Sequence, residues 1–285
     1  MSGSRVFADG ALAGRVAIVT GGGTNLGKAA AAELALCSAN VVIVGRRREV
    51  LEQAAAEIGE GCDWISGDIR ERAQADQIVR AALERHGRLD FLLNNAGGQY
   101  FVPAEAIATK GWRAVQRLNV SGTLAMSCAA CELAMRPAGA GMIVNVTVSP
   151  HHGMPAMAHT GAARAAVEAL TKELATECKP DGVSVAAIAV GRFATESLRK
   201  YPGELWKSAA ATVPLQRLGE VEEYGWLVAL LASPLGPAFS GTVITIDGGL
   251  DNWTGPWPPQ GLAQGGEVPT EARGPSPARP AGPVA

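Results

Sequence analysis

Short runs of β-branched residues alternate with longer runs rich in Ala and Leu along most of the chain. The short runs are largely apolar, which is typical of strands buried on both faces of a parallel sheet, and they lie at 15–20, 40–44, 63–66, 91–94, 142–147, 184–188 and 243–246. The longer runs are helical in character and lie at 26–36, 49–58, 73–85, 111–135, 161–177 and 221–231. This alternation predicts right-handed strand–helix–strand units joined into one parallel sheet.

A glycine-rich segment joins the first expected strand to the first expected helix, and it reads Thr20-Gly21-Gly22-Gly23-Thr24-Asn25-Leu26-Gly27. Glycines there let the backbone turn sharply and approach a pyrophosphate, which binds the free N–H groups at the helix N-terminus. A plain tight turn is the alternative, but the position between strand and helix favours a dinucleotide. We therefore expect an α/β protein with a doubly wound Rossmann fold, in which helices cover both faces of a seven-stranded parallel sheet.

The composition is that of a folded domain without a polyanionic partner. The chain has 285 residues, of which 47% are hydrophobic and 18% charged, and its net charge is -2, so we expect no nucleic-acid partner. We expect one domain over 1–257. A tail at 258–285, rich in Pro, Gly and Ala, has no periodic apolar face and is predicted to be disordered.

Neither a membrane span nor a signal peptide is recognised in the sequence, so we expect a cytoplasmic protein without membrane contact. The cysteine count is five, an odd number that favours reduced thiols. Cys128 and Cys131 form a C-x-x-C inside an expected helix. Because no second ligand pair accompanies them, we interpret them as small core side chains and expect no metal site.

The end of the second expected strand bears on the choice between the two nicotinamide cofactors. An acidic residue there would accept hydrogen bonds from a ribose 2'-hydroxyl and repel a 2'-phosphate. This chain instead has Gly45 followed by Arg46, Arg47 and Arg48. Arg48 fits a solvated helix start, whereas Arg46 suits a phosphate in charge and geometry. The sequence therefore favours NADP(H).

Four motifs in this order resemble the short-chain dehydrogenase/reductase family over roughly residues 10–253: the glycine-rich segment, Asn94-Asn95-Ala96-Gly97, Asn119 and Ile246-Asp247-Gly248-Gly249. Asn25 stands where that family usually has glycine, and Asn tolerates a left-handed backbone. The resemblance implies that Asp68 and Ile69 flank the adenine, that Asn94 holds the adenosine side and that Thr195 reaches the nicotinamide. The implied cofactor residues are Gly21, Gly23, Thr24, Asn25, Leu26, Gly27, Arg46, Arg47, Asp68, Ile69, Asn95, Ala96, Gly97, Arg164, Gly191 and Thr195.

The catalytic residues depart from the family pattern. The resemblance places Thr160 at the usual Tyr, Arg164 at the usual Lys, and Thr147 or Val148 at the usual Ser, while Asn119 matches. A Tyr, with an unperturbed pKa of about 10, gives a proton to the alkoxide that hydride transfer to a ketone creates. Thr is far less acidic, and Arg keeps its proton but supplies a lasting positive charge. The site therefore suits oxyanion stabilisation better than proton delivery.

Hydride addition to an enoyl thioester fits that description, because it creates an enolate that Arg164 and Thr160 could hold. Local segments also resemble the peroxisomal trans-2-enoyl-CoA reductases, a subgroup related to the dienoyl-CoA reductases. They are Asn95-Ala96-Gly97-Gly98-Gln99-Tyr100, Lys110-Gly111-Trp112 and His159-Thr160-Gly161-Ala162-Ala163-Arg164-Ala165. The resemblance implies an acyl-thioester substrate and a homotetramer or homodimer.

Histidines supply candidate proton donors near this end of the site, since an imidazole titrates near neutral pH. His159 precedes the Tyr position, so on a helix its side chain would point about 100° away from that of Thr160. His151 and His152 follow the fifth expected strand. Packing roles are the alternative for each. We expect Arg164, Thr160, Asn119, Thr147 and His159 to be catalytic and Gln99, Tyr100, His152 and Met154 to bind substrate.

Three functions remain open from the sequence. The first is NADPH-dependent reduction of the C=C bond of a 2-enoyl thioester. The second is an NADP-binding protein without catalysis, in which the Tyr and Lys have been lost. The third is a carbonyl reductase or alcohol dehydrogenase with a substitute proton donor. Turnover of an enoyl-CoA with NADPH distinguishes the first from the other two.

Overall fold

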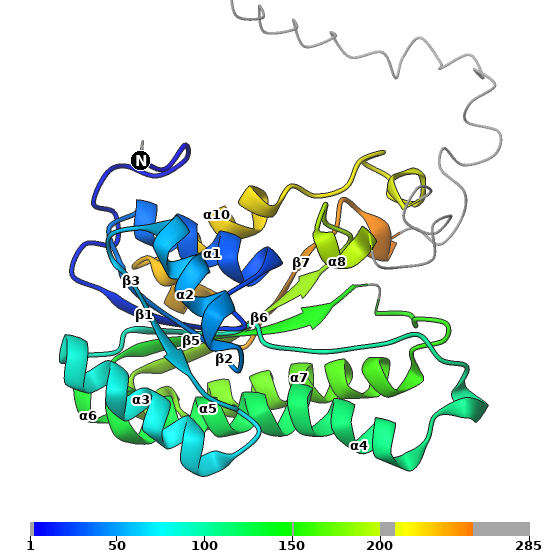
Figure 1. The fold of residues 1–285 in the computed structure, drawn as a ribbon, viewed down its shortest axis with the longest axis horizontal. Helices are drawn as coiled ribbons and strands as arrows, with labels where there is room; N and C mark the ends of the chain where they lie inside the picture. Colours follow the sequence, from blue (N-terminus) through cyan, green and yellow to red (C-terminus); the bar gives the residue numbers. More distant parts are fainter. Residues whose placement is uncertain (1–2, 150, 200–208, 253–285) are drawn as a thin grey trace, which may run out of the picture.

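Seven parallel strands form one sheet in the order β3-β2-β1-β4-β5-β6-β7 (Figure 1). The computed structural model describes residues 3–149, 151–199 and 209–252. The strands are β1 (Val16–Thr20), β2 (Asn40–Gly45), β3 (Cys62–Ser66), β4 (Phe91–Asn94), β5 (Gly141–Val148), β6 (Val183–Val190) and β7 (Val243–Ile246). This arrangement confirms the predicted doubly wound Rossmann fold with its seven-stranded parallel sheet.

Helices cover both faces of the sheet, as predicted (Figure 1). One face is covered by α1 (Asn25–Leu36), α2 (Arg48–Ile58) and α10 (Val221–Ala232). The opposite face is covered by α3 (Arg72–His86), α5 (Gly122–Ala130) and α7 (Ala158–Glu177). The shorter helices are α4 (Thr109–Gln116), α6 (Arg136–Ala138) and α8 (Glu196–Arg199).

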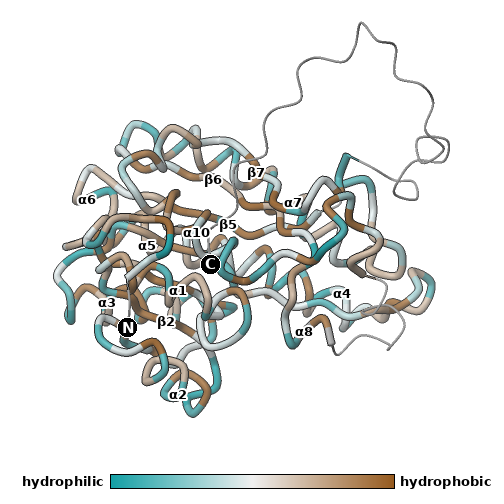
Figure 2. Tube along the Cα trace, turned by 90° about the horizontal axis from the view of Figure 1, so that it is seen from above, coloured by the Kyte–Doolittle hydropathy of each residue, from teal (hydrophilic) through white to brown (hydrophobic). Residues whose placement is uncertain are grey.

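Alternate residues of the inner strands contribute to two separate cores. On β1, Ala17 and Val19 pack toward α1 and α10, whereas Ile18 packs with the core beneath α3 and α5. Burial on both sides explains why the strands are apolar at nearly every position. In Figure 2 the apolar colouring runs along the strands, and polar colouring gathers toward the outside of the molecule.

The expected helix at 111–135 is part of a longer helical run, from Thr109 to Ala138, that includes two π-helical turns. The turns are Arg117–Ser121 and Cys131–Met135, and π-bulges often mark functional positions. By length and composition alone this run could cross a membrane, although no membrane span was recognised from the sequence. More than half of its most apolar part is buried inside the fold, where it packs against α3 and α7, so we interpret it as a core helix.

The described residues contain five cysteines, and none of them forms a disulfide in this structure. Cys131 is buried and Cys128 is partly buried, so the C-x-x-C is only in part a core feature. The Sγ of Cys131 lies 3.6 Å from that of Cys178 on the neighbouring helix end. Within residues 3–149, 151–199 and 209–252, no group of three potential ligands could hold a metal ion. The predicted tail at 258–285 lies outside the described residues.

Candidate functional site

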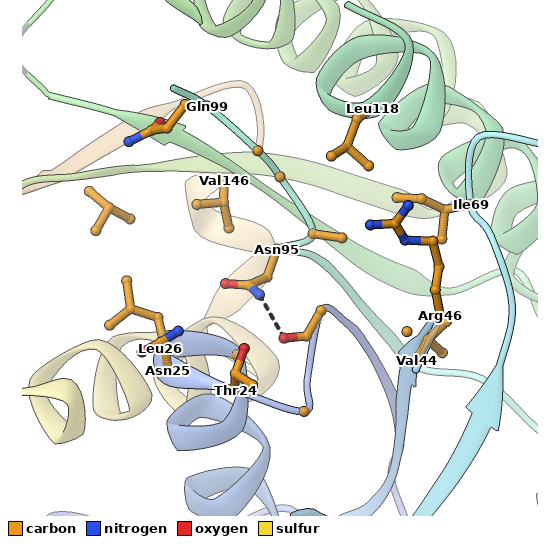
Figure 3. Close-up of a pocket in the computed structure, with 18 of the residues that line it drawn as sticks. Thr24, Asn25, Leu26, Val44, Arg46, Ile69, Asn95, Gln99, Leu118 and Val146 are labelled. Carbon is orange, nitrogen blue, oxygen red and sulfur yellow. Dashed lines mark hydrogen bonds between the residues drawn. The ribbon is translucent and has the colours of Figure 1, made fainter. Parts of the chain in front are cut away.

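A cavity of about 630 Å³ opens at the carboxyl ends of the strands (Figure 3). It lies where β1 and β4 are neighbours, which is the point at which the strand order reverses. Ligands of open α/β sheets bind at such a switch point. With the exception of Asn94, the residues predicted to bind the cofactor all line this cavity: Gly21, Gly23, Thr24, Asn25, Leu26, Gly27, Arg46, Arg47, Asp68, Ile69, Asn95, Ala96, Gly97, Arg164, Gly191 and Thr195.

The glycine-rich segment forms the floor of the cavity. Its backbone turns so tightly that the glycine positions leave little room for a side chain. Gly21 has a φ of 66°, and a Cβ on Gly27 would overlap the carbonyl oxygen of Gly21. Asn25 has a φ of 49°, the left-handed conformation expected for Asn in place of glycine. The segment leads directly into the N-terminus of α1, whose free N–H groups favour an anion.

Asn95 fixes this segment to the end of β4. Its Nδ2 donates to the carbonyl oxygen of Thr20 at 3.0 Å. It also donates to that of Gly21 at 3.4 Å, the hydrogen bond drawn in Figure 3. The Oδ1 of Asn95 accepts a hydrogen bond of 3.4 Å from the buried hydroxyl of Tyr224 on α10. No sequence motif predicts this contact. Asn94 lies outside the cavity wall, where its Nδ2 donates to Ser127 and Asn145, so the expected adenosine contact of Asn94 is not seen.

At the end of β2 the cavity is basic. Arg46 and Arg47 line it, and Arg46 reaches the side of Ile69 (Figure 3). The pKa of the Asp68 carboxyl is lowered, mainly by its hydrogen bonds with Arg70 and in part by the charge of Arg46. Arg48 points elsewhere, since its Nε bonds Glu52 at 2.9 Å, as expected for a helix start.

Arg164 places a buried positive charge at the other end of the cavity. Its Nη1 donates to the carbonyl oxygen of Val146 at 2.7 Å, and its Nε has no hydrogen-bond partner among the described residues. Only 9% of Arg164 is exposed. Burial lowers its pKa to about 10, so the guanidinium stays protonated at neutral pH.

Asn119 lies behind the cavity wall, where it braces the loop after β4. Its Nδ2 donates to the carbonyl oxygen of Gly98 at 2.9 Å, and its Oδ1 accepts from the backbone N of Gly98 at 3.2 Å. A second bond from Nδ2 reaches the carbonyl oxygen of Val115 within the helix. Asn119 therefore positions Gly97 and Gly98 and does not itself line the cavity.

The pair formed by Thr160 and Arg164 is not assembled at the cavity wall. Thr160 is fully buried and outside the wall, and its backbone N donates to Nδ1 of His159 at 2.9 Å. His159 is fully buried too, and its ring packs edge-on against Tyr100 with the centroids 4.4 Å apart. Its Nε2 has no hydrogen-bond partner among the described residues. Tertiary packing thus directs His159 and Thr160 into the core.

Of the residues expected to bind substrate, Gln99 lines the cavity. Tyr100, His152 and Met154 lie outside its wall. Tyr100 is 40% exposed, and His152 has its Nδ1 3.6 Å from Oδ1 of Asp251. Apolar side chains complete this end of the cavity, of which the sequence analysis had singled out Val148 as an alternative to Thr147 at the usual Ser: Leu118, Val146, Val148 and Val190.

Thr147 lines the cavity and belongs to a polar cluster that the sequence did not reveal. Its hydroxyl donates to Oε1 of Glu168 at 2.9 Å, and the same oxygen lies 2.9 Å from Nε2 of His151. Nδ1 of His151 lies 2.5 Å from Oδ2 of Asp251. The cluster joins β5, α7 and the turn after β7, segments too far apart in sequence for periodicity to connect them.

Known proteins resemble this chain over nearly its whole described length. A family model described as enoyl-(acyl carrier protein) reductase matches residues 22–251. A probable 2,4-dienoyl-CoA reductase, (2E)-enoyl-CoA-producing, from Bacillus subtilis strain 168 is 35% identical over 252 residues, covering 86% of this chain and 98% of the relative. A peroxisomal 2,4-dienoyl-CoA reductase, (3E)-enoyl-CoA-producing, from Danio rerio is 32% identical, covering 86% of this chain and 84% of the relative.

Solved structures of similar proteins superpose on this chain. A citronellol catabolism dehydrogenase from Pseudomonas aeruginosa PAO1 superposes with a TM-score of 0.77 at 36% identity, covering 86% of this chain and 98% of the other. A short chain dehydrogenase from Bacillus anthracis superposes with a TM-score of 0.78 at 33% identity, covering 85% of this chain and 99% of the other. Nearly the full length of each of these structures is therefore matched.

Proposed function

Because the chain belongs to the short-chain dehydrogenase/reductase family of oxidoreductases, we propose that it uses NADPH to reduce a C=C bond conjugated to the carbonyl of an acyl thioester. The proposal depends on the position and surroundings of the Arg164 side chain. A buried guanidinium with an unpartnered Nε stands at the cavity wall where the family pattern has a Lys, and no Tyr accompanies it among the described lining residues. Such a site stabilises a negative oxygen better than it supplies a proton.

The cavity fits a nicotinamide dinucleotide. Close approach of a pyrophosphate requires backbone without side chains, and Gly21 and Gly27 provide it beside the N-terminus of α1. Arg46 at the end of β2 supports the phosphorylated form, since no carboxylate stands at that strand end. When bound, this cofactor supplies the hydride.

The protein's own residues then act on the substrate. Arg164 holds the thioester oxygen as it becomes an enolate, and its charge, desolvated by burial, interacts more strongly there than in water. Asn119 positions the Gly97–Gly98 backbone beside that oxygen. Gln99 and the apolar wall formed by Leu118 and Val148 exclude water from the reacting carbons. Thr160 has no part in this proposal, since it is buried outside the wall.

The names of the relatives support a thioester substrate. The Bacillus subtilis and Danio rerio proteins are both named 2,4-dienoyl-CoA reductases, and the family model is described as an enoyl-(acyl carrier protein) reductase. We propose the same chemical class here, a 2-enoyl or 2,4-dienoyl thioester. The dehydrogenase name of the Pseudomonas aeruginosa structure favours including alcohols and ketones among the substrates tested. By the same relationship we propose a homodimer or homotetramer.

A substrate panel with NADPH tests the proposal. We expect oxidation of NADPH with crotonyl-CoA or a 2,4-dienoyl-CoA, and negligible rates with 3-ketoacyl-CoA or simple ketones. In the reverse direction, we expect negligible reduction of NADP⁺ with primary alcohols. Robust ketone reduction would identify a carbonyl reductase with a substitute acid. Tight NADPH binding in fluorescence titration without turnover on the whole panel would identify a non-catalytic cofactor-binding protein.

A further inference from the structure

Reduction of the C=C bond consumes one proton for every hydride, and this chain lacks the Tyr and Lys that usually deliver it. Arg164 keeps its proton, and Thr160 is buried outside the cavity wall. Among the hydroxyl groups along the described wall, that of Thr147 is hydrogen-bonded to a titratable side chain, the carboxylate of Glu168. Thr147 therefore connects the cavity wall to a group that can carry a proton.

We propose that His151, Glu168 and Thr147 form a proton path from the surface to the cavity and that this path supplies the proton for the reduction. The inference rests on the proposed function. One carboxylate oxygen, Oε1 of Glu168, bridges the other two groups at 2.9 Å to Nε2 of His151 and 2.9 Å to Oγ of Thr147. A proton that arrives from the imidazole thus needs only to reorient about a single oxygen.

The cluster runs from the surface inward. The side chain of His151 is 33% exposed, that of Glu168 is 19% exposed, and Thr147 is fully buried in the wall. His151 is therefore in contact with water, while Thr147 is enclosed in the cavity wall, where its hydroxyl lies between Glu168 and the carbonyl oxygen of Arg164. Asp251 fixes the orientation of the imidazole, because its Oδ2 holds Nδ1 and its Oδ1 accepts from the backbone N of His151 at 2.6 Å.

The charges around His151 come from three segments. Glu168 on α7 and Asp251 in the turn after β7 are negative, and His152 is the neighbouring basic group. Asp247 holds Asp251 in place by accepting from its backbone N at 2.7 Å. Although burial disfavours the charged imidazole, the hydrogen bond with Asp251 and the charges of Glu168 and Asp251 raise the pKa of His151. These contacts thus favour the charged imidazolium.

Protons and electrons balance along this path. The hydride brings two electrons and one hydrogen to the substrate carbon, leaving an enolate. Nε2 of the imidazolium of His151 gives its proton to the Glu168 carboxylate, and the protonated Glu168 passes a proton to Oγ of Thr147 as the Thr147 hydroxyl gives its own proton to the enolate. The neutral imidazole then takes a proton from water. No residue changes oxidation state.

Three variants test the path with a 2-enoyl-CoA and NADPH across pH 5.5–9. His151→Phe and Thr147→Val should each lower kcat at least tenfold, within the range known for general acids, while Thr147→Ser retains most of the rate. The fall of kcat at high pH should disappear in His151→Phe. NADPH affinity, measured by fluorescence, should change less than twofold in all three. His86→Phe, which replaces a histidine on α3 beside Asp63, should behave as wild type.

A measurement that does not require enzymatic turnover completes the test. In proton NMR of the cofactor-free protein, Glu168→Gln should lower the titration midpoint of His151. Unchanged kcat and pH profile in His151→Phe and Thr147→Val, with the wild type active, would overturn the proton path and leave the proposed function intact. An inactive wild type on every enoyl-CoA would overturn both. Equal loss in Thr147→Val and Thr147→Ser would show a packing role and refute the path.

Discussion

Gly97 lies directly against the guanidinium of Arg164. A Cβ on Gly97 would overlap Nη2 of Arg164 and stand 2.8 Å from Oδ1 of Asn119. Asn119 cannot retreat easily, because both of its amide atoms are bonded to Gly98. The backbone after β4 thus fixes the position of the charge on which the proposed chemistry depends.

Gly97→Ala should therefore displace Arg164. We expect kcat with a 2-enoyl-CoA to fall at least tenfold, with a loss of about 1–3 kcal/mol in unfolding free energy from overpacking. Gly161→Ala is the matched control, since a Cβ there meets no atom within 4 Å and the residue lies in α7. The control should be as active as wild type and slightly more stable. Full activity of Gly97→Ala would show that the position of Arg164 is unimportant.

Removal of the charge itself should have a larger effect. Arg164→Ala should lower kcat on the order of a hundredfold or more, the scale for loss of one oxyanion donor, and Arg164→Lys should keep part of the activity. Stopped-flow rates and NADPH fluorescence titration check this. A loss of NADPH affinity that accounts for the whole effect would show that Arg164 binds the cofactor ribose instead of the enolate.

Stability should depend on pH through His151. Its pKa is raised in the folded protein above the ordinary value of 6.5. The stabilisation is therefore fully present below about pH 6.5 and is lost as pH rises through the higher folded-state pKa. We expect urea denaturation at several pH values to show this decline in wild type and a flatter profile in His151→Phe. Identical profiles would contradict it.

The sequence predicted the sheet well because buried parallel strands have a distinctive composition. The strands Phe91–Asn94 and Val243–Ile246 have the predicted bounds. The glycine-rich segment, from which a dinucleotide site was predicted, forms the floor of the cavity. Backbone constraints of this kind are local. They identify the cofactor end because a tight turn and a helix N-terminus are encoded by adjacent residues.

The reaction end was harder to predict because tertiary contacts decide it. The family resemblance placed Thr160 beside Arg164 in the site, yet Tyr100 packs against His159 and both His159 and Thr160 are buried in the core. The contact of His151 with Asp251 joins residues 100 positions apart. No pattern in the sequence indicates such a pair, and side-chain geometry was needed to find it.

Cofactor preference provides the last prediction. Arg46 lines the cavity at the end of β2, where an acidic residue would select the unphosphorylated cofactor. NADPH should bind at least about tenfold tighter than NADH, a difference of about 1.4 kcal/mol. Arg46→Ala should remove most of this difference by weakening NADPH binding and leave NADH affinity nearly unchanged.

Arg48→Ala serves as the control, because Arg48 bonds Glu52 and lies over the ring of Trp64 instead of facing the cavity. It should keep the wild-type preference, whereas Arg46→Glu should reverse it by repelling the 2'-phosphate. Isothermal titration with both cofactors measures all four proteins under one salt concentration, since phosphate contacts weaken as salt rises. Equal affinities for NADPH and NADH in wild type would refute the assignment of Arg46 to the 2'-phosphate, whatever the variants show.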